Sequence, residues 1–490
     1  MPIFMGIDAG TTNVKVVLAD ENRTILASAS EATRIHAPFD GAREMDMDEL
    51  WDVVCRLALD VRDLAPDAFN QIEGVGVSAQ GDGMWPIGAD GKPVGNAVLW
   101  NDLRTRELTG IDEQALDRLL IDHSSTALFS GASPLILKWI SEKEPERFAL
   151  IHKAVRCKDW LNYKLTGDLA SDFTDHSTCG INIFTRKHLP EIYDFLDIPG
   201  AAEMLPCLIS STDITGRVSA EASSRCAIAA GTPVIAGALD LAAVSFGAGL
   251  TKKDDGCVIL GTTLCSYILL GKEQVDVTAR AGSTLCSILP DRYVRLMASL
   301  SGSTAVDWAK SVLAPELSFA ELEVELKKVP PGSRGVLYHP YISGERAPFR
   351  NPFACGGFYG LTSSHNRFDM LRAAYEGMAL SLLDCHRALP ETDGQIYIAG
   401  GGAVSGFTCN LVASALGRRV TRTNCRELAA LGIIDAVKLG LGYEIQTEAC
   451  ADADLFLPDP ELTELYGSML SRFTTMRGRM EPYWNERAGD

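Results

Sequence analysis

Blocks of apolar and polar residues follow one another along this chain and predict a protein of mixed strands and helices. The first apolar run, residues 3–7, is broken by a small polar stretch over residues 8–13 and resumes at Val14. This pattern predicts two strands joined by a tight turn. Residues 46–64 carry apolar side chains at helical spacing, and residues 72–78 form a small, apolar run typical of a buried strand. We therefore expect the chain to open with a hairpin, a helix and a further strand.

The polar break in the first hairpin contains residues suited to binding an anion. Gly10 lets the main chain approach closely, and Thr11 and Thr12 bring hydroxyl groups beside backbone N–H groups. Asp8 ends the first strand and adds a carboxylate, which is favourable beside a phosphate only when a divalent cation lies between them. The segment alone is equally typical of an ordinary hairpin in which Asp and Gly form the turn.

The same pattern returns in the second half of the chain. Gly261, Thr262 and Thr263 separate an apolar run at residues 257–260 from another at residues 264–270. Two such hairpins in opposite halves indicate a duplicated domain, with two phosphate-facing turns for one nucleotide. The pair resembles the superfamily of sugar kinases, heat-shock proteins and actin.

Composition narrows the class of protein and its partners. A length of 490 residues predicts two or more domains, and a net charge of −19 disfavours nucleic acid and anionic membranes as partners. The 13 cysteines show no metal-ligand spacing, and the sequence contains neither a signal segment nor a run of transmembrane length. We therefore expect a cytoplasmic protein with reduced thiols and no membrane partner.

Two polar clusters follow predicted strands in the first half, where α/β folds place ligand contacts. Gln80 and Asp82 can hydrogen-bond sugar hydroxyls, although a glycine-rich turn explains the same pattern. Asn101, Asp102 and Arg104 stand at the end of the next strand and strengthen the functional interpretation.

Two carboxylates in the first half have both a chemical and a structural interpretation. An apolar strand delivers Asp240 to the start of a small-residue helix, where it suits either a general base or a helix N-cap. Asp175 and His176 suggest a catalytic pair, but an aspartate–hydroxyl loop with capping roles is commoner, and we favour capping there.

A strand late in the chain ends in Gly400, Gly401 and Gly402 and is followed by a helix. Three successive glycines cost conformational entropy, so a close approach of adenosine or α-phosphate explains them better than a flexible turn. Ser405 and Asn410 follow at once and are candidate adenosine contacts.

Motifs along nearly the whole chain narrow the resemblance to the FGGY family of carbohydrate kinases. The segment Gly344-Glu345-Arg346 resembles the family's Gly-Glu-Arg loop, and residues 356–376 fit its second signature at every constrained position. The hairpins, the polar clusters, the Asp240 strand and the triple glycine occur in the family's order. Single motifs of this kind are weak, but the ordered set is specific.

The resemblance implies an α/β fold with duplicated actin-like ATPase (ribonuclease H-like) domains and an interdomain cleft. It implies that residues 1–249 form an N-terminal domain that binds sugar and carries the base. Residues 250–490 would then form a C-terminal domain that binds the nucleotide, after a charged linker near residues 249–256. ATP and Mg²⁺ are the implied cofactors. Homodimers are common in the family, and the sequence leaves the oligomeric state open.

The resemblance also implies roles for the residues that match the family's motifs. Asp240 is the expected catalytic base, and Asp8 and Asp240 are the expected Mg²⁺ ligands. The expected substrate contacts are Gln80, Gly81, Asp82, Trp100, Asn101, Asp102 and Arg104. The expected nucleotide contacts are Gly10, Thr11, Thr12, Asn13, Lys15, Gly261, Thr262, Thr263, Gly302, Gly400, Gly401, Gly402, Ser405 and Asn410.

The implied activity is ATP-dependent phosphorylation of a primary hydroxyl on a small acyclic sugar, foremost a pentulose of the xylulose type. The loop at residues 78–83 resembles L-xylulose kinases, whereas residues 100–104 resemble D-xylulose kinases. Gly81-Asp82 stands where D-xylulose kinases usually carry Met-His, and the Arg-Glu pair of glycerol kinases is missing. The alternatives are a polyol kinase of the erythritol or glycerol type and a non-catalytic, actin-like ATP-binding sugar sensor.

Overall fold

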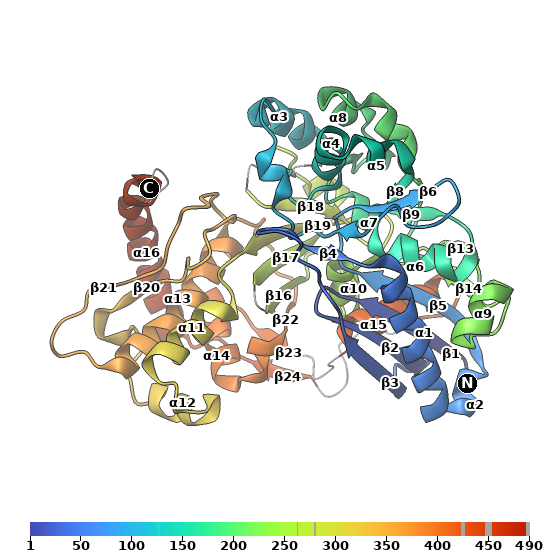
Figure 1. Cartoon of the computed structure of the whole chain (residues 1–490). Helices are drawn as coiled ribbons and strands as arrows, with labels where there is room; N and C mark the ends of the chain where they lie inside the picture. Colours follow the sequence, from blue (N-terminus) through green and yellow to red (C-terminus); the bar gives the residue numbers. More distant parts are fainter. Residues whose placement is uncertain are drawn as a thin grey trace. The chain divides into compact units, whose positions relative to one another are not determined.

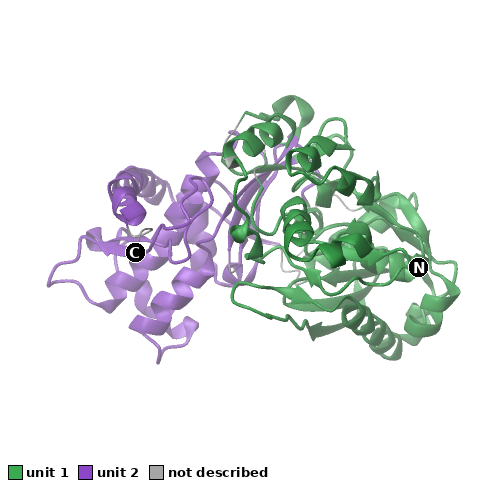
Figure 2. Ribbon diagram, turned by 45° about the horizontal axis from the view of Figure 1, so that its top comes forward, with its two compact units in different colours: residues 1–249, 271–293, 425–448 green, residues 250–270, 294–424, 449–490 purple. Residues whose placement is uncertain are grey.

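The computed structural model describes residues 1–124, 126, 128–261, 263–278, 281–422, 427–445 and 453–486. The chain divides into two compact units, coloured separately in Figure 2. Unit 1 contains residues 1–249, 271–293 and 425–448, and unit 2 contains residues 250–270, 294–424 and 449–490. Two segments that follow residue 249 in the sequence thus belong to the first unit.

Unit 1 is built on a mixed sheet whose strands can be followed in Figure 1. In spatial order these strands are β13 (Ile214–Arg217), β14 (Pro233–Ile235), β5 (Ile72–Ala79), β1 (Ile3–Ala9), β2 (Asn13–Asp20) and β3 (Ile25–Ala32). The short strand β15 (Ala238–Leu239) also pairs with β5. The first two strands form the predicted antiparallel hairpin, and β5 runs parallel to β1. The hairpin predicted from the apolar blocks is therefore confirmed.

The two faces of this sheet carry different side chains because neighbouring residues of a strand point to opposite faces. Gly6 of β1 and Gly74 and Gly76 of β5 lie against α15 (Leu428–Gly440). A methyl group on Gly6 would come within 2.5 Å of the Ala430 carbonyl oxygen. Helix α15 can therefore pack this closely on the sheet only at residues without a side chain.

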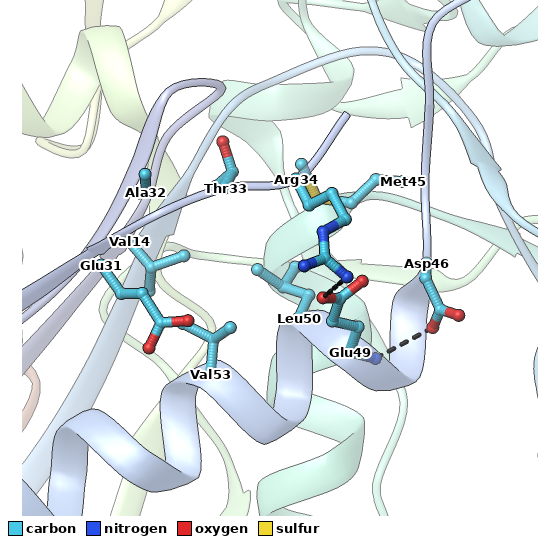
Figure 3. Close-up of a pocket in the computed structure, with 10 residues that line it drawn as sticks. All are labelled: Val14, Glu31, Ala32, Thr33, Arg34, Met45, Asp46, Glu49, Leu50 and Val53. Atoms are coloured by element: carbon cyan, nitrogen blue, oxygen red, sulfur yellow. Dashed lines mark hydrogen bonds and ion pairs between the residues drawn. The ribbon is translucent and has the colours of Figure 1, made fainter. Parts of the chain in front are cut away.

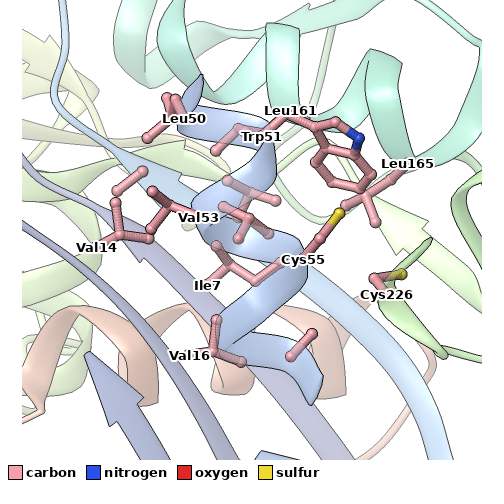
Figure 4. Packing of buried hydrophobic residues seen from close by; sticks show 14 of the residues in the cluster. Ile7, Val14, Val16, Leu50, Trp51, Val53, Cys55, Leu161, Leu165 and Cys226 are labelled. Carbon is pink, nitrogen blue, oxygen red and sulfur yellow. The ribbon is translucent and has the colours of Figure 1, made fainter. Parts of the chain in front are cut away.

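The opposite face packs on α1 (Met47–Leu64), whose range matches the predicted helix. Asp46 caps α1 by accepting hydrogen bonds from two backbone N–H groups of its first turn. Figure 4 shows Leu50, Trp51 and Val53 of α1 between sheet residues and the side chains of α6 (Cys157–Thr166). Apolar residues at helical spacing thus form the main core of unit 1.

Small elements between the strands complete unit 1. Its other helices are α2 (Pro66–Phe69), α3 (Glu113–Ser124), α4 (Ser133–Lys143), α5 (Pro145–Leu150), α7 (Phe173–His176), α8 (Pro190–Phe195), α9 (Ala220–Cys226) and α10 (Asp240–Gly247). Its short strands include β4 (Glu44–Met45), β6 (Trp85–Gly88), β7 (Ala97–Val98), β8 (Ile151–Val155), β9 (Ala170–Asp172) and β12 (Cys207–Ile209). A second apolar cluster lies under α3, α4 and α8.

Unit 2 repeats the central pattern of unit 1. Its strands follow the order β19 (Arg292–Ser299), β17 (Leu264–Gly271), β16 (Gly256–Leu260), β22 (Ile396–Ala399), β23 (Val420–Arg422) and β24 (Asp454–Phe456). Strands β16 and β17 form an antiparallel hairpin, and β22 runs parallel to β16 as β5 does to β1. The helices are α11 (Ser303–Leu313), α12 (Phe319–Leu326), α13 (Arg367–Arg387), α14 (Gly406–Leu416) and α16 (Pro460–Glu486).

The repeated arrangement confirms the predicted α/β fold with duplicated actin-like domains. None of the helices in the described ranges combines the length and apolar character that crossing a membrane requires.

Candidate active site

Asp8 stands at the end of β1 on the face that packs against α15. Its neighbour across the parallel register is Ser78 of β5, whose hydroxyl donates to Asp8 Oδ1 over 2.8 Å. Burial raises the pKa of Asp8 to about 6, while the Ser78 hydrogen bond and the charge of Lys15 act in the opposite direction. Lys15 is held 2.9 Å from Glu427 at the start of α15. The strand end thus presents a desolvated carboxylate close to a paired ammonium group.

The turn after β1 brings together residues that are far apart in the sequence. The Trp100 indole N–H donates to Thr11 Oγ1 over 2.9 Å, and the Thr11 hydroxyl donates to Gln80 Oε1 over 3.1 Å. Gly10 N donates to Asn13 O over 3.0 Å and closes the turn. Three of the predicted segments therefore meet here, with the Thr11 hydroxyl at their centre.

Asp240 is the first residue of α10 and directly follows β15. The N-cap position belongs to Leu239, and Asp240 Oδ1 accepts from the N–H of Leu241 over 2.6 Å. Burial and the negative charge of Asp8 raise the pKa of Asp240 to about 7, and Asp82 adds a smaller contribution in the same direction. A carboxyl group with this pKa can accept a proton near neutral pH.

The loop after β5 holds Asp82 in a strained, enclosed position. Asp82 has a φ of +55°, and the following Gly83 has a φ of +66°, both in the left-handed region. Asp82 Oδ1 accepts from the Thr178 hydroxyl over 2.7 Å and from the Cys179 thiol over 3.2 Å. Burial raises the pKa of Asp82. The Nε2 group of Gln80 is buried and has no hydrogen-bond partner within the described part of the chain, so this loop holds an unused donor.

Asp102 and Arg104 form a buried ion pair. Arg104 Nε donates to Asp102 Oδ1 and Arg104 Nη2 to Asp102 Oδ2, each over 2.9 Å, and both side chains are fully buried. Backbone N–H groups of Arg43 and Arg104 donate to the same carboxylate, and Glu44 accepts from Arg104. Both oxygens of Asp102 are thus engaged inside the protein. The neighbouring Asn101 keeps a buried Oδ1 without a partner in the described residues.

The predicted nucleotide-side residues of unit 2 gather around the end of β16. Gly261 O accepts from Ser303 N over 2.9 Å, which ties the β16–β17 turn to the start of α11 just after Gly302. Gly400 has a φ of +95°, and a methyl group there would lie 2.5 Å from the Leu260 carbonyl oxygen. Backbone therefore approaches backbone closely at this turn.

The remaining predicted nucleotide contacts of unit 2 have local partners. Ser405 caps α14 by accepting from Thr408 N, and the Asn410 amide donates to the Gly406 carbonyl. Gly401 has no atom within 4 Å of where a methyl group would project. Thr262 lies outside the described residues.

Asp175 is a residue whose surroundings the sequence did not reveal. The capping residue of α7 is Asp172, which accepts from the N–H groups of Thr174 and Asp175. Asp175 Oδ1 instead accepts from the Asp82 N–H over 3.2 Å and lies 3.7 Å from Arg156 Nε. A signal was present in the basic residues at 156 and 158, because each stands next to apolar residues or cysteine and a buried cation needs a buried partner.

The donor set of unit 1 fits a magnesium ion. Asp8 and Asp240 offer hard carboxylate oxygens, and Asp8 acts on Asp240 as a neighbouring negative charge. Mg²⁺ is commonly bound by one or two carboxylates together with substrate phosphates. The described residues contain no cluster of three or more His, Cys, Asp or Glu side chains suited to a metal.

A small groove elsewhere on unit 1 lies between β3 and α1 (Figure 3). Arg34 and Glu49 bridge it with an ion pair of 3.1 Å. Its lining includes none of the predicted site residues, so it is separate from the group around Asp8 and Asp240.

Comparison with known proteins assigns the family. Residues 3–247 match the N-terminal domain, and residues 256–436 the C-terminal domain, of the FGGY family of carbohydrate kinases. The chain belongs to the FGGY family of carbohydrate kinases. It is accordingly a kinase that acts on a sugar or polyol.

Individual relatives cover nearly the whole chain. A xylulose kinase from Lactococcus lactis subsp. lactis (strain IL1403) is 29% identical over 484 residues, which are 95% of this chain and 94% of the relative. An erythritol kinase from Brucella abortus (strain 2308) is 28% identical over 511 residues, with 99% and 98% covered. The solved structure of ligand-bound xylulose kinase from Lactobacillus acidophilus matches with a TM-score of 0.92 at 22% identity, covering 99% of this chain and 100% of its own. At 22% identity, similarity to this solved structure supports the fold of the chain and no functional role.

Proposed function

We propose that this protein transfers the γ-phosphoryl group of ATP to a primary hydroxyl of a small acyclic sugar, most closely a pentulose of the xylulose type. The observation that carries the proposal is Asp240, a desolvated carboxyl at a strand end with a pKa raised to about 7. Similarity to a xylulose kinase over almost the full length supports the substrate class.

Asp240 takes the proton from the attacking hydroxyl as the oxygen bonds to phosphorus. Its raised pKa suits this task. A base whose pKa is near the working pH is largely deprotonated there and still binds a proton readily. The candidate nucleotide contacts of unit 1 are the backbone at Gly10 and Lys15. Those of unit 2 are the turns at Gly261 and Gly400.

Asp8 and Asp240 would hold Mg²⁺ in this proposal, and the ion would neutralise charge on the transferred group. A bound cation would also lower the pKa of Asp240 from the value of about 7 that it has without the metal. The protein's own part is positioning and a preorganised electrostatic environment, which account for most of the catalysis in phosphoryl transfer.

A polyol kinase of the erythritol type is the second candidate. An erythritol kinase is as similar to the chain as the xylulose kinase is, within one percentage point of identity. Asp82 also stands where the sequence departs from the Met-His pair of D-xylulose kinases, and a carboxylate there suits a hydroxyl donor.

The test is ADP release with Mg-ATP across D- and L-ketopentoses, erythritol, other pentitols, glycerol and 3-keto-L-gulonate. We expect a pentulose to stimulate release well above the background measured without sugar. Stimulation by erythritol alone would favour the polyol kinase, and no stimulation by any compound would contradict both assignments.

A further inference from the structure

Glu427 is a carboxylate of unit 1 to which the proposed phosphoryl transfer gives no role. It occupies the N-cap position of α15, directly before the first helical residue, Leu428. Its side chain accepts no hydrogen bond from the N–H groups of the first helical turn, although capping side chains usually do. The carboxylate instead accepts from the ammonium group of Lys15 over 2.9 Å. Glu427 therefore serves a contact outside its own helix.

Lys15 stands within reach of two carboxylates. In the register of the β1–β2 hairpin it lies directly opposite Asp8. Opposite residues of an antiparallel pair project from the same face of the sheet, so their side chains can meet. Burial is the largest cause of the raised pKa of Asp8, and among the smaller causes the charge of Lys15 lowers this pKa while that of Glu427 raises it. Both charges thus act on Asp8, but the ammonium group is paired with Glu427.

The position of Glu427 is fixed by the packing of α15 on the hairpin. A methyl group on Gly6 of β1 would come within 2.5 Å of the Ala430 carbonyl oxygen, so the first turn of the helix lies directly on the strand. Further along the helix, Lys438 Nζ donates to the Glu21 carbonyl just after β2, over 2.8 Å. The helix is thus attached to the hairpin at both of its ends, and the carboxylate of Glu427 stays beside β2.

The two possible partners of Lys15 have different consequences for the site. An ammonium group has three N–H donors, so a pair with Glu427 leaves donors for a phosphate oxygen. Asp8 is an expected Mg²⁺ ligand, and an ammonium group on it would occupy a carboxylate oxygen and cancel the charge that attracts the cation. The lysine stem is flexible, so the positions of the two carboxylates decide which of them the ammonium group meets.

We propose that Glu427 is a positioning residue that holds Lys15 away from Asp8 and so leaves Asp8 free to bind the Mg²⁺ that accompanies the nucleotide. This inference rests on the proposed function and assigns a part in it to α15. The side chains of the pair are 32% exposed for Lys15 and 21% exposed for Glu427. Ion pairs of such exposure change an equilibrium by up to about fivefold, which sets the size of the expected effect.

The test measures how much Mg²⁺ strengthens binding of AMP-PNP, an ATP analogue that is not hydrolysed. The ratio of Kd in EDTA to Kd in excess Mg²⁺ is obtained by calorimetry with the full-length protein at pH 8, where Asp8, with a pKa of about 6, is ionised. We expect Glu427→Gln to lower this ratio about three- to fivefold, because Lys15 then turns to Asp8. Glu427→Ala should lower it equally and supplies the test if Glu427→Gln does not fold.

Lys15→Met provides the background that separates positioning of Lys15 from a purely structural role of Glu427. Without an ammonium group to restrain, adding Glu427→Gln should change the ratio less than about 1.5-fold relative to Lys15→Met alone. An equal fall in both backgrounds would overturn the inference, because Glu427 would then act without Lys15. An unchanged ratio for Glu427→Gln in the wild-type background would overturn it as well.

Asp60→Asn, on the exposed surface of α1, is the control for removal of one carboxylate, and we expect its ratio to equal that of the wild type. A wild-type ratio near one would contradict the inference together with the Mg²⁺ ligands on which it depends. Absence of ADP release with every acceptor would instead contradict the proposed function itself, so the failures are distinguishable.

Discussion

At Asp102, the carboxylate that the sequence offers as a sugar ligand is enclosed by an arginine two positions further along the chain. The pair is fully buried, with two N–H···O bonds from the guanidinium and two more from backbone N–H groups. A carboxylate bound by four N–H groups stabilises the loop, and these groups come together around Asp102 only when the chain folds. Sequence motifs reveal the residue types but not which of them close on each other.

We predict that Asp102→Asn acts on stability more than on substrate binding. Removing one partner leaves Arg104 with Glu44 as its remaining counterion, and breaking a buried pair costs about 3 kcal/mol. Urea denaturation should show that loss, while KM for the sugar in the folded enzyme changes less than about threefold. A tenfold rise in KM at unchanged stability would instead identify Asp102 as a substrate ligand. Asp60→Asn is again the control for both readouts.

Among the elements, the strand-to-helix turn after β22 is tightly constrained at Gly400. Gly400 has a φ of +95° and a ψ of 172°, a region almost restricted to glycine, and its Cα hydrogen faces the Leu260 carbonyl. Gly401, the next residue, lies in open space with an ordinary φ. The two neighbouring glycines therefore differ in what they contribute to the turn.

We predict that Gly400→Ala lowers the free energy of unfolding by at least about 2 kcal/mol, because it adds both backbone strain and a clash. Gly401→Ala should change it by less than about 0.5 kcal/mol. Thermal denaturation of the two variants gives the comparison. Equal losses would show that the turn is not constrained at Gly400. A stable Gly401→Ala protein with weakened ATP binding would support close approach of the nucleotide at that residue.

Regular elements were the most predictable part of the chain. The helix expected over residues 46–64 is observed as Met47–Leu64, because apolar periodicity and the Asp46 cap both act locally. Asp240 was likewise placed correctly at the start of a helix, although its alternative interpretation as the N-cap was not borne out. The surroundings of Asp175 could not be predicted, since its partners come from residues about 20 and 90 positions away.

On the scale of the whole molecule, the division of the chain into units depends on contacts between segments that are far apart in the sequence. Helix α15 lies more than 400 residues from β1, yet it packs on that strand and carries Glu427 to Lys15 at its start. Periodicity shows only that α15 is apolar, and it cannot show which sheet the helix covers. Residues 425–448 therefore join unit 1 for reasons visible only in the fold.

Stability at acid pH should depend on a histidine in unit 2. His339 is fully buried, its Nε2 lies 2.9 Å from the Phe473 carbonyl oxygen, and burial lowers its pKa to about 4. In the unfolded chain the same group binds a proton near pH 6.5. Its contribution is thus complete above pH 6.5 and is lost as the pH falls toward 4, by up to about 3 kcal/mol.

We predict that His339→Gln flattens this part of the pH dependence. The glutamine amide can still donate to the Phe473 carbonyl, but it does not titrate. Urea denaturation between pH 7 and pH 4.5 should give a smaller loss of stability than in the wild type, while His36→Gln, at an exposed position, should follow the wild type. Parallel curves for all three proteins would contradict the role of His339.

The account as a whole depends on Asp240 as the group that accepts the proton. The decisive measurement is kcat for Asp240→Asn with the best acceptor from the ADP-release panel, alongside calorimetric binding of that acceptor. The account predicts a loss of about 100-fold or more in kcat with acceptor affinity within about threefold of the wild type. Normal turnover in this variant would contradict it and remove Asp240 from the mechanism.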